Sequence, residues 1–362
     1  MQKIIIKTPI NTLSLGQTSY CLLREMYKRN ADISVWPIEP RVDLDPFNPD
    51  PKFAQWLREM VVNRYFKYDV ETPSLNMWHI NGSESRITKS QNLFTFHETD
   101  RLTAHEVKLL AAQDRIFVSS NYTRDTFINA GIDDKKVIFA PLGFDESLLF
   151  GAKKPNPTIQ FSLIGKLEKR KNTLKILKLW TKHFGNKSGY ALTCIIHNPF
   201  IKPEQQQQMI MEALGPVRYT NIQFLPYLKS NKEVASIMNN MDIDLSGISN
   251  AEGWGLPSFN SVCLGKHAIV TNVTAHKDWA TEDVAVMLEP SGKQNVYDNI
   301  HFIENQPFNQ GQIYDFSDDD IVAAFDKVVA RYRASSTNHE GIKLRTKFTW
   351  ANTLDILEAN MV

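Results

Sequence analysis

The sequence predicts an α/β protein built from two doubly wound, Rossmann-like domains that face each other across a cleft. Apolar, β-rich runs alternate with amphipathic helical patterns, which is typical of a parallel sheet wrapped by helices. A segment rich in Lys, Pro and Asn interrupts the alternation at residues 151–158, and the same alternation then starts again. The length of 362 residues suits two domains of ordinary size, and a hydrophobic content of 42% suffices for two cores.

The first domain is expected to span residues 1–150. Its apolar runs predict strands at 3–7, 33–36, 75–80, 93–97, 115–119 and 137–140. Helical patterns lie between several of them, at 17–28, 52–65, 104–112 and 122–129.

The second domain is expected to span residues 151–344. Strands are predicted at 159–164, 191–197, 222–225, 243–245 and 267–270. The predicted helices are 172–183, 203–214, 232–239, 256–264 and 319–331. The final amphipathic segment, within 345–362, is predicted to be helical as well.

Composition narrows the class of protein. Lys and Arg total 41 against 40 Asp and Glu, so net charge gives no support for nucleic-acid or membrane binding. The cysteines Cys21, Cys194 and Cys263 lie far apart in apolar runs, which predicts buried thiols in a reducing compartment. The first apolar run is too short for a signal peptide, and no run is long enough to span a membrane. We therefore expect a cytoplasmic protein.

The most informative segment is 250–273, in which an acidic residue precedes Gly-Trp-Gly-Leu-Pro. Pro257 suits the first turn of a helix, and Gly265 suits the left-handed residue that ends it. The free N–H groups of such a helix start favour anions, and Glu252 just before it can accept hydrogen bonds from sugar hydroxyls. The segment therefore predicts a phosphate-and-sugar site. The alternative is that Glu252 only caps the helix.

A second candidate is the segment 165–173, which directly follows a predicted strand. Gly165 permits a turn, and Lys166 and Lys171 follow it. Lysines at a strand's carboxyl end can neutralise a diphosphate leaving group. The alternative is a solvated basic helix face, because lysines continue along the chain after this loop.

Three weaker candidates lie elsewhere. His97 ends a predicted strand, where an imidazole can contact a sugar or phosphate, although a histidine there is more often structural. Gly16 lies at the start of the first helix, and a single glycine there is weak support for ligand binding. Tyr227 follows a strand and can flank a nucleobase.

The segment 252–260 resembles the donor-site motif of the retaining glycosyltransferases of group 1, which have the GT-B fold. In that family two glutamates flank a Gly-Phe-Gly-Leu-Pro core. Here Glu252 is the first glutamate, Trp254 replaces Phe, and Asn260 stands at the second position. The basic loop with Lys171-Asn172 and the His97-Glu98 pair match the family in the same order. Further landmarks lie at 113–128, 140–145 and Trp350.

The resemblance implies an enzyme that moves a sugar from a UDP- or GDP-linked donor to an acceptor hydroxyl with retention of configuration. The second domain would bind the donor, and the first would bind a glycan, lipid-linked, protein or other acceptor. The helix within 345–362 would cross back onto the first domain. The family needs no metal or permanently bound cofactor. The implied catalytic residues are Glu252, His97 and Lys171, and the implied donor-binding residues are Lys166, Lys171, Glu252, Gly253, Trp254, Gly255, Leu256, Asn260, Gly16 and Tyr227.

Asn260 keeps alternatives open. The family's second glutamate contacts the donor ribose, and an asparagine offers a donor and an acceptor there without the charge. The change fits an altered donor preference, and it also fits a non-catalytic GT-B subunit that binds a glycan or another glycosyltransferase. A sugar-nucleotide epimerase is the third possibility.

Overall fold

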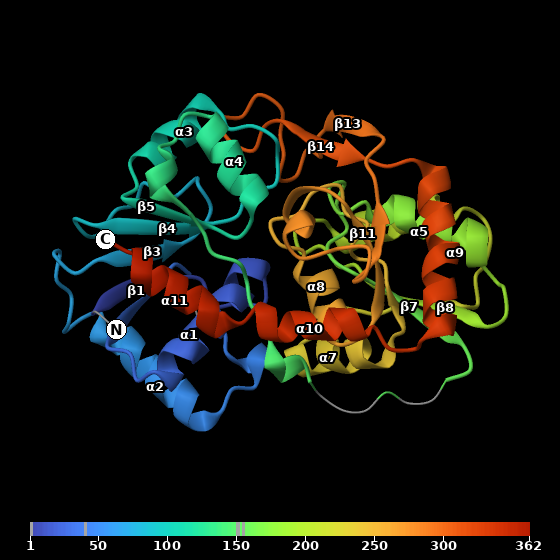
Figure 1. Ribbon diagram of the computed structural model, residues 1–362, viewed down its shortest axis with the longest axis horizontal. Coiled ribbons are helices and arrows are strands. Elements are labelled where there is room, and N and C mark those ends of the chain that lie inside the picture. The colour runs from blue at the N-terminus through green and yellow to red at the C-terminus, as the bar shows by residue number, and fades with distance from the viewer. Residues whose placement is uncertain (1–2, 40–41, 150–152, 154–155) are drawn as a thin grey trace. The chain divides into compact units, whose positions relative to one another are not determined.

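The computed structural model describes residues 3–39, 42–149, 153 and 156–362, so half of the linker predicted at 151–158 lies outside the described residues. The chain forms two compact units (Figure 1). Unit 1 comprises Met1–Asp145, Gln306–Asn309 and Thr346–Val362, and unit 2 comprises Glu146–Asn305 and Gln310–Arg345. Each unit contains one parallel sheet of six strands.

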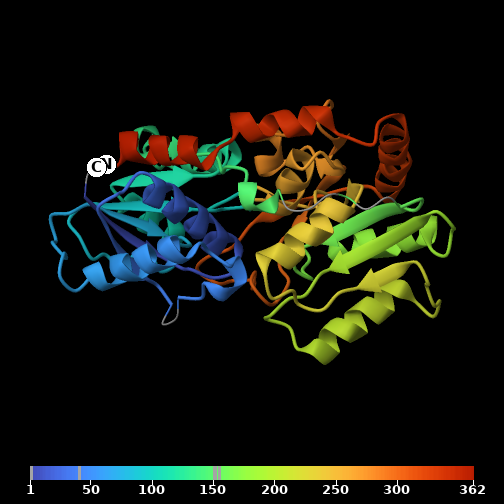
Figure 2. The ribbon, with the colours of Figure 1, turned by 90° about the horizontal axis from the view of Figure 1, so that it is seen from below.

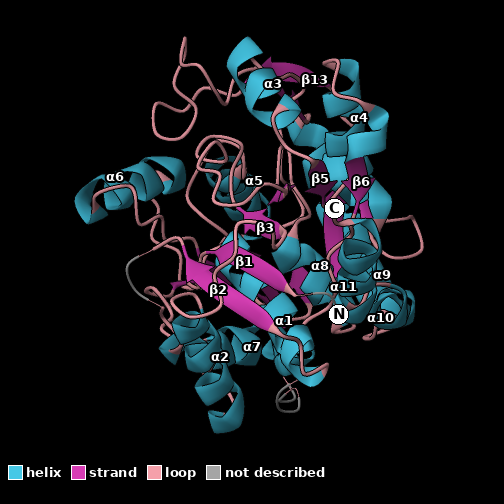
Figure 3. Ribbon diagram, turned by 90° about the vertical axis from the view of Figure 1, so that its left-hand side faces the viewer, coloured by secondary structure: helices cyan, strands magenta, loops and turns pink. Residues whose placement is uncertain are grey.

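The sheet of unit 1 has the order β2-β1-β3-β4-β5-β6, and every neighbouring pair is parallel. Figure 3 shows β1 and β2 lying side by side. Most residues of these strands are buried, because helices cover both faces of a parallel sheet. The strands are β1 (Ile4–Thr8), β2 (Ile33–Pro37), β3 (Ser74–Met77), β4 (Gln91–Thr95), β5 (Arg115–Val118) and β6 (Val137–Phe139).

Most helices of unit 1 begin at a residue whose side chain accepts a hydrogen bond from a free backbone N–H group. Asp50 caps α2, and Thr103 forms a capping box with Glu106 at the start of α3. α1 packs against α2 and α11 (Figure 2). The helices are α1 (Ser14–Lys28), α2 (Pro51–Asn63), α3 (Ala104–Ala111), α4 (Asn121–Asn129) and α11 (Trp350–Asn360).

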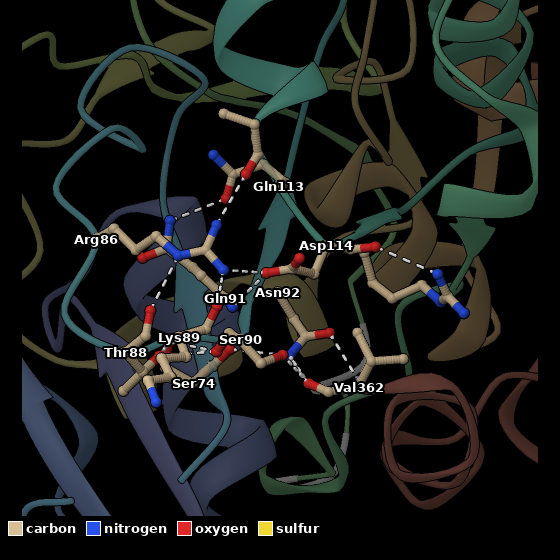
Figure 4. A network of polar contacts seen from close by, with 12 residues as sticks. Ser74, Arg86, Thr88, Lys89, Ser90, Gln91, Asn92, Gln113, Asp114 and Val362 are labelled. Atoms are coloured by element: carbon tan, nitrogen blue, oxygen red, sulfur yellow. Dashed lines mark hydrogen bonds and ion pairs between the residues drawn. The ribbon is translucent and has the colours of Figure 1, made fainter. Parts of the chain in front are cut away.

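A network of hydrogen bonds lies at the amino ends of the strands in the sheet of unit 1 (Figure 4). The side chain of Gln91 donates to Gln113 at 2.9 Å, and that of Asn92 donates to the carbonyl of Ser74 at 3.0 Å. Asn92 also exchanges hydrogen bonds of 3.2 Å with the backbone of Val362. The network ties the segment after α11 to β4, at the end of the sheet opposite to that where ligands bind.

The sheet of unit 2 has the order β12-β11-β10-β7-β8-β9, and its neighbouring strands are again parallel. An antiparallel hairpin of β13 and β14 is separate from it. The strands are β7 (Ile159–Ile164), β8 (Tyr190–Ile195), β9 (Ile222–Phe224), β10 (Ile243–Asp244), β11 (His267–Thr271), β12 (Val286–Leu288), β13 (Gly292–Asn295) and β14 (Gln312–Asp315).

The core of unit 2 is rich in aromatic side chains from β7 and from α5, which packs beside α9. Phe161, Trp180 and Phe325 are fully buried there. The helices that begin in this unit are α5 (Thr173–Phe184), α6 (Pro203–Leu214), α7 (Asn231–Asn240), α8 (Leu256–Cys263), α9 (Asp318–Ala334) and α10 (His339–Lys347).

The predicted α/β class with two Rossmann-like sheets is confirmed. The predicted strands and helices all occur, most with boundaries within three residues of those observed, whereas β12–β14 and α10 were not predicted. The helix predicted within 345–362 occurs as α11, which begins at Trp350, shortly after α10 ends at Lys347. Thr349 separates them, since its hydroxyl accepts from the N–H of Asn352 at 3.1 Å and so starts a new helix.

The three cysteines are buried and free, as predicted. Across the described residues, no helix is both long enough and apolar enough to cross a membrane.

Candidate functional site

The candidate site of unit 2 lies where its strand order reverses. After β7 the chain continues with β8 and β9 on one side, whereas β10, β11 and β12 follow on the other side. The loops after β7 and β10 therefore diverge at the carboxyl edge of the sheet, where doubly wound sheets bind ligands. The two loops contact each other, since the N–H of Asn250 donates to the carbonyl of Arg170 at 2.8 Å.

A buried ion pair joins these loops. Lys171 follows β7 and places its Nζ 2.5 Å from Oε1 of Glu252, which follows β10. Nη1 of Arg170 lies 3.4 Å from the other carboxylate oxygen, and it also donates to the carbonyl of Ala251 at 2.7 Å. Nη2 of Arg170 pairs with Glu168 at 2.8 Å. The structure thus brings together Glu252 and Lys171, which the sequence singled out separately.

These charges keep Glu252 ionised. Burial alone would raise the pKa of its carboxyl, but Lys171 and Arg170 outweigh burial and lower the pKa to about 2. His276 lies in the same buried group, and burial is the main reason that its pKa falls to about 4. At neutral pH Glu252 is therefore a carboxylate beside the cations Lys171 and Arg170, and His276 is a neutral imidazole.

Gly255 connects Glu252 to the helix α8. Its φ is +83°, in the left-handed region that favours glycine, and a Cβ there would lie 2.5 Å from Nε2 of His276. Pro257 lies in the first turn of α8, and Gly265 follows the helix with a φ of +80°, as predicted. Gly255 is thus required by its backbone conformation and by the imidazole packed against it.

Trp254 belongs to a buried aromatic cluster. Its side chain is 3% exposed, and its ring centroid lies 5.3 Å from that of Phe259. The indole N–H of Trp279 donates to the backbone carbonyl of Trp254 at 2.9 Å. The residues around it, Gly253, Gly255 and Leu256, form the backbone that leads into α8.

Buried polar atoms near the two loops lack hydrogen-bond partners among the described residues. Asn172 starts α5 with a φ of +58°, and its Nδ2 is buried without an acceptor. Oδ1 of Asn260, on α8, is buried without a donor. An unpaired buried donor or acceptor costs about 1–3 kcal/mol, so these two groups can hydrogen-bond to a ligand or to a water molecule.

Lys166, in the loop after β7, lies next to aromatic side chains. Its Nζ lies 5.2 Å from the ring centroid of Phe200, and that ring meets His301 edge-on at 4.7 Å. Tyr227 is 50% exposed and contacts the ring of His197 at 5.6 Å.

Two predicted site residues belong to unit 1. His97 follows β4, is 4% exposed, and shares a 3.1 Å hydrogen bond between its Nε2 and the hydroxyl of Thr99. Burial lowers the pKa of His97. Gly16 lies in the first turn of α1, where a Cβ would lie 2.3 Å from the carbonyl oxygen of Asn11. The backbone of Asn11 therefore lies too close to position 16 for a side chain, which explains why this residue is a glycine.

Sequence reasoning missed Arg170 and His276. Arg170 lies inside the basic loop that was singled out for its lysines. His276 follows β11, so its place beyond the carboxyl end of a predicted strand was the available signal. Within the described part of the chain, no group of three or more His, Cys, Asp or Glu side chains is arranged to hold a metal ion.

Comparison with known proteins links the fold to glycosyltransferases. No protein-family model matches the chain, and a search of curated protein sequences finds no significant match. The structure is similar to sucrose-phosphate synthase from Thermosynechococcus elongatus, with a TM-score of 0.70 and 11% identity over 99% of this chain and 98% of that one. It is also similar to HepE of Anabaena in complex with UDP-glucose, with a TM-score of 0.66 and 11% identity over 99% of both chains.

A third similar structure is an α,α-trehalose-phosphate synthase (UDP-forming) from Burkholderia vietnamiensis, with a TM-score of 0.64 and 10% identity over 99% of both chains. At such identities the likeness establishes the fold. The fold of this chain is therefore that of the GT-B glycosyltransferases, as the resemblance to the group 1 family predicted.

Proposed function

We propose that this protein is a glycosyltransferase that moves a sugar from a nucleotide sugar to an acceptor hydroxyl with retention of configuration. The observation that carries the proposal is the buried pair of Lys171 and Glu252 at the switch point of unit 2. A carboxylate held ionised beside cations suits a ligand that combines hydroxyl groups with phosphate.

The diphosphate would bind at the start of α5. Lys166 and Lys171 supply positive charge there, and the buried Nδ2 of Asn172 supplies a donor that lacks an acceptor among the described residues. The N–H groups of the first helical turn add further donors. In the transition state these groups would stabilise the negative charge that develops on the leaving diphosphate. The proposal requires no metal ion and no permanently bound cofactor.

The sugar and ribose would bind along the segment 252–260. Glu252 would accept hydrogen bonds from sugar hydroxyls and stabilise positive charge at the anomeric carbon. The backbone of Gly253, Trp254, Gly255 and Leu256 would line the ligand, since the indole of Trp254 is buried in the aromatic cluster. Oδ1 of Asn260 is a buried acceptor that a ribose hydroxyl would satisfy. Tyr227, which is half exposed, would flank the base.

Unit 1 would supply the acceptor side. His97 is neutral because burial lowers its pKa, so it would act as a hydrogen-bonding group near the reacting sugar. Gly16 would shape the same side through the tight loop that it allows. The acceptor hydroxyl would attack on the face from which the diphosphate departs, and a phosphate oxygen would take its proton.

The similar structures favour a UDP-sugar as the first donor to test. One of them contains UDP-glucose, and another is described as UDP-forming. Calorimetry with UDP-, GDP- and ADP-glucose would measure binding, and a coupled assay would measure nucleotide release with a panel of acceptors. Binding with transfer would support the proposal. Binding without turnover would favour the non-catalytic alternative, conversion without an acceptor would favour an epimerase, and no binding would reject a donor site.

A further inference from the structure

His276 is held in one orientation by its Nδ1 atom. Nδ1 lies 3.0 Å from the hydroxyl oxygen and 3.2 Å from the carbonyl oxygen of Thr271. The Thr271 hydroxyl donates to the carbonyl of Ser249 at 2.8 Å, so towards His276 it acts as an acceptor. Because both partners accept, Nδ1 carries the proton of the neutral ring.

Nε2 of His276 is therefore an acceptor with a free electron pair. It is fully buried, and it has no hydrogen-bond partner among the residues that the structure describes. It lies against Gly255, in the turn that also holds Glu252. That turn is fixed from the same side, because the hydroxyl of Thr274 accepts from the N–H of Glu252 at 3.0 Å.

Lys171 has two anionic partners in the proposed function. In the structure, it pairs with Glu252 at 2.5 Å. A bound diphosphate would draw the same ammonium towards its oxygens. Arg170 compensates only in part, since it also binds Glu168 and the carbonyl of Ala251. A buried carboxylate that loses part of its cationic partner needs another positive charge nearby.

We propose that His276 supplies this charge by taking up one proton from the solvent at Nε2 when a nucleotide sugar binds, which makes it a positioning residue for Glu252. The inference rests on the proposed function. No bond other than the new N–H forms, and the proton comes from the buffer. The imidazolium would hold Glu252 in place while Lys171 contacts the diphosphate.

The surrounding charges favour protonation of His276 when Lys171 moves towards the diphosphate. Burial is the main cause that lowers the pKa of His276, Lys171 lowers it further, and Glu252 raises it. Movement of Lys171 towards the ligand would weaken one of the lowering effects and leave the attraction of Glu252 in place. The pKa of His276 would then rise from about 4, with burial still opposing the charged form.

Calorimetry at pH 6 with UDP-glucose tests the inference. Binding would be measured in buffers of different ionisation enthalpy, because the dependence of the observed enthalpy on the buffer gives the number of protons taken up. UDP-glucose has no terminal phosphate monoester, the group that titrates near pH 6. We expect a measurable fraction of one proton taken up by the wild type and none by His276→Asn, whose amide can still donate to Thr271. His183→Asn, a histidine far along α5 that pairs with Asp326, serves as the control that keeps the uptake.

The outcomes separate the inference from the proposed function. Tight binding without proton uptake, or uptake that persists in His276→Asn, would overturn the role of His276 and leave the donor site intact. Loss of uptake in His301→Asn instead would assign the proton to another histidine and would also overturn it. If none of UDP-, GDP- and ADP-glucose binds, the proposed function fails and the inference fails with it. Nitrogen-15 NMR of the histidine rings gives a second readout, because protonation of Nε2 shifts its resonance even where His276→Asn is unstable.

Discussion

Lys171 and Glu252 are 81 residues apart in the sequence and form a buried ion pair with 2.5 Å between Nζ and Oε1. The pair joins the loops after β7 and β10, the strands between which the order of the second sheet reverses. A strand order of this kind leaves a crevice at the carboxyl edge, and the pair places opposite charges there.

Glu252→Gln should separate binding from turnover. The amide keeps the shape of the side chain but cannot stabilise positive charge at the sugar, so kcat should fall about 100- to 1000-fold. Affinity for UDP should stay the same or increase, because Lys171 is released from its carboxylate partner. Steady-state kinetics and calorimetry measure the two effects. Asp145→Asn, which alters a buried carboxylate paired with Arg24 in unit 1, should change kcat little. A Glu252→Gln enzyme with normal turnover would remove Glu252 from the chemistry.

Lys171→Met should weaken UDP binding about tenfold or more, equivalent to about 1.4 kcal/mol. Lys178→Met, on the exposed side of α5, the helix that follows the loop containing Lys171, is the matched control and should bind UDP normally. Equal affinities of the two variants would contradict a phosphate role for Lys171.

Lys171→Met should also change how the stability of the protein depends on pH. The folded pKa of Glu252 is lowered to about 2, so the stabilisation is present above the unfolded value near 4.3 and is lost as the pH falls through about 2. The difference in free energy of unfolding between wild type and Lys171→Met should therefore be largest at neutral pH and shrink towards pH 2. Urea unfolding at several pH values measures it, and a difference that does not vary with pH would contradict the ion pair.

Asn260→Ala should lower donor affinity without a loss of stability. The buried Oδ1 of Asn260 has no donor in the described structure, so its removal relieves a cost of about 1 kcal/mol that offsets the lost packing. UDP-glucose affinity should fall severalfold, because the ribose loses its acceptor. Thermal unfolding and calorimetry on the same preparation compare the two quantities. A variant that loses stability and retains its affinity would show that Asn260 is structural.

Gly255→Ala should destabilise the protein more than Gly189→Ala does. Both glycines have a φ of +83°, so each substitution strains the backbone by about 1–2 kcal/mol. A Cβ at Gly255 also meets His276 at 2.5 Å, whereas a Cβ at Gly189 has no neighbour within 4 Å among the described atoms. The excess destabilisation in chemical denaturation should disappear when Gly255→Ala is combined with His276→Ala. Equal effects of both single substitutions would contradict the packing of His276 against Gly255.

Asp244→Asn should flatten the pH dependence of stability. Asp244 is fully buried on β10, and burial raises its pKa to about 6 although neighbouring hydroxyl and N–H groups lower it. The contribution of Asp244 to the free energy of unfolding is largest below the unfolded pKa near 3.9, and it is lost as the pH rises through about 6. Two pKa units correspond to about 3 kcal/mol, so the stability of the variant relative to wild type should increase by about this amount from pH 4 to pH 7.5. Urea unfolding at both pH values checks the change, and a constant difference would show that Asp244 ionises freely.

The fold was largely predictable because local patterns report local structure. Buried parallel strands are continuous apolar runs, and helix starts and stops carry capping residues, as at Pro257 and Gly265. The start of α11 at Trp350 could not be placed from the amphipathic pattern, which extends upstream of it, because the side-chain cap at Thr349 sets that start. β12 is short, and its pairing with β11 rather than its composition makes it a strand.

The α/β class and the chemistry of the short segments that contain Lys166, Lys171, Glu252 and Asn260 follow from residue type and local spacing alone. Three properties depend on the folded arrangement: the strand order that joins Lys171 to Glu252, the burial that makes His276 neutral, and the placement of the Trp254 indole in a hydrophobic cluster. These properties depend on which segments meet across the sheet and on how far water is excluded. The segment around Glu252 looked like a helix start for phosphate, and the fold makes it one side of a buried charge network.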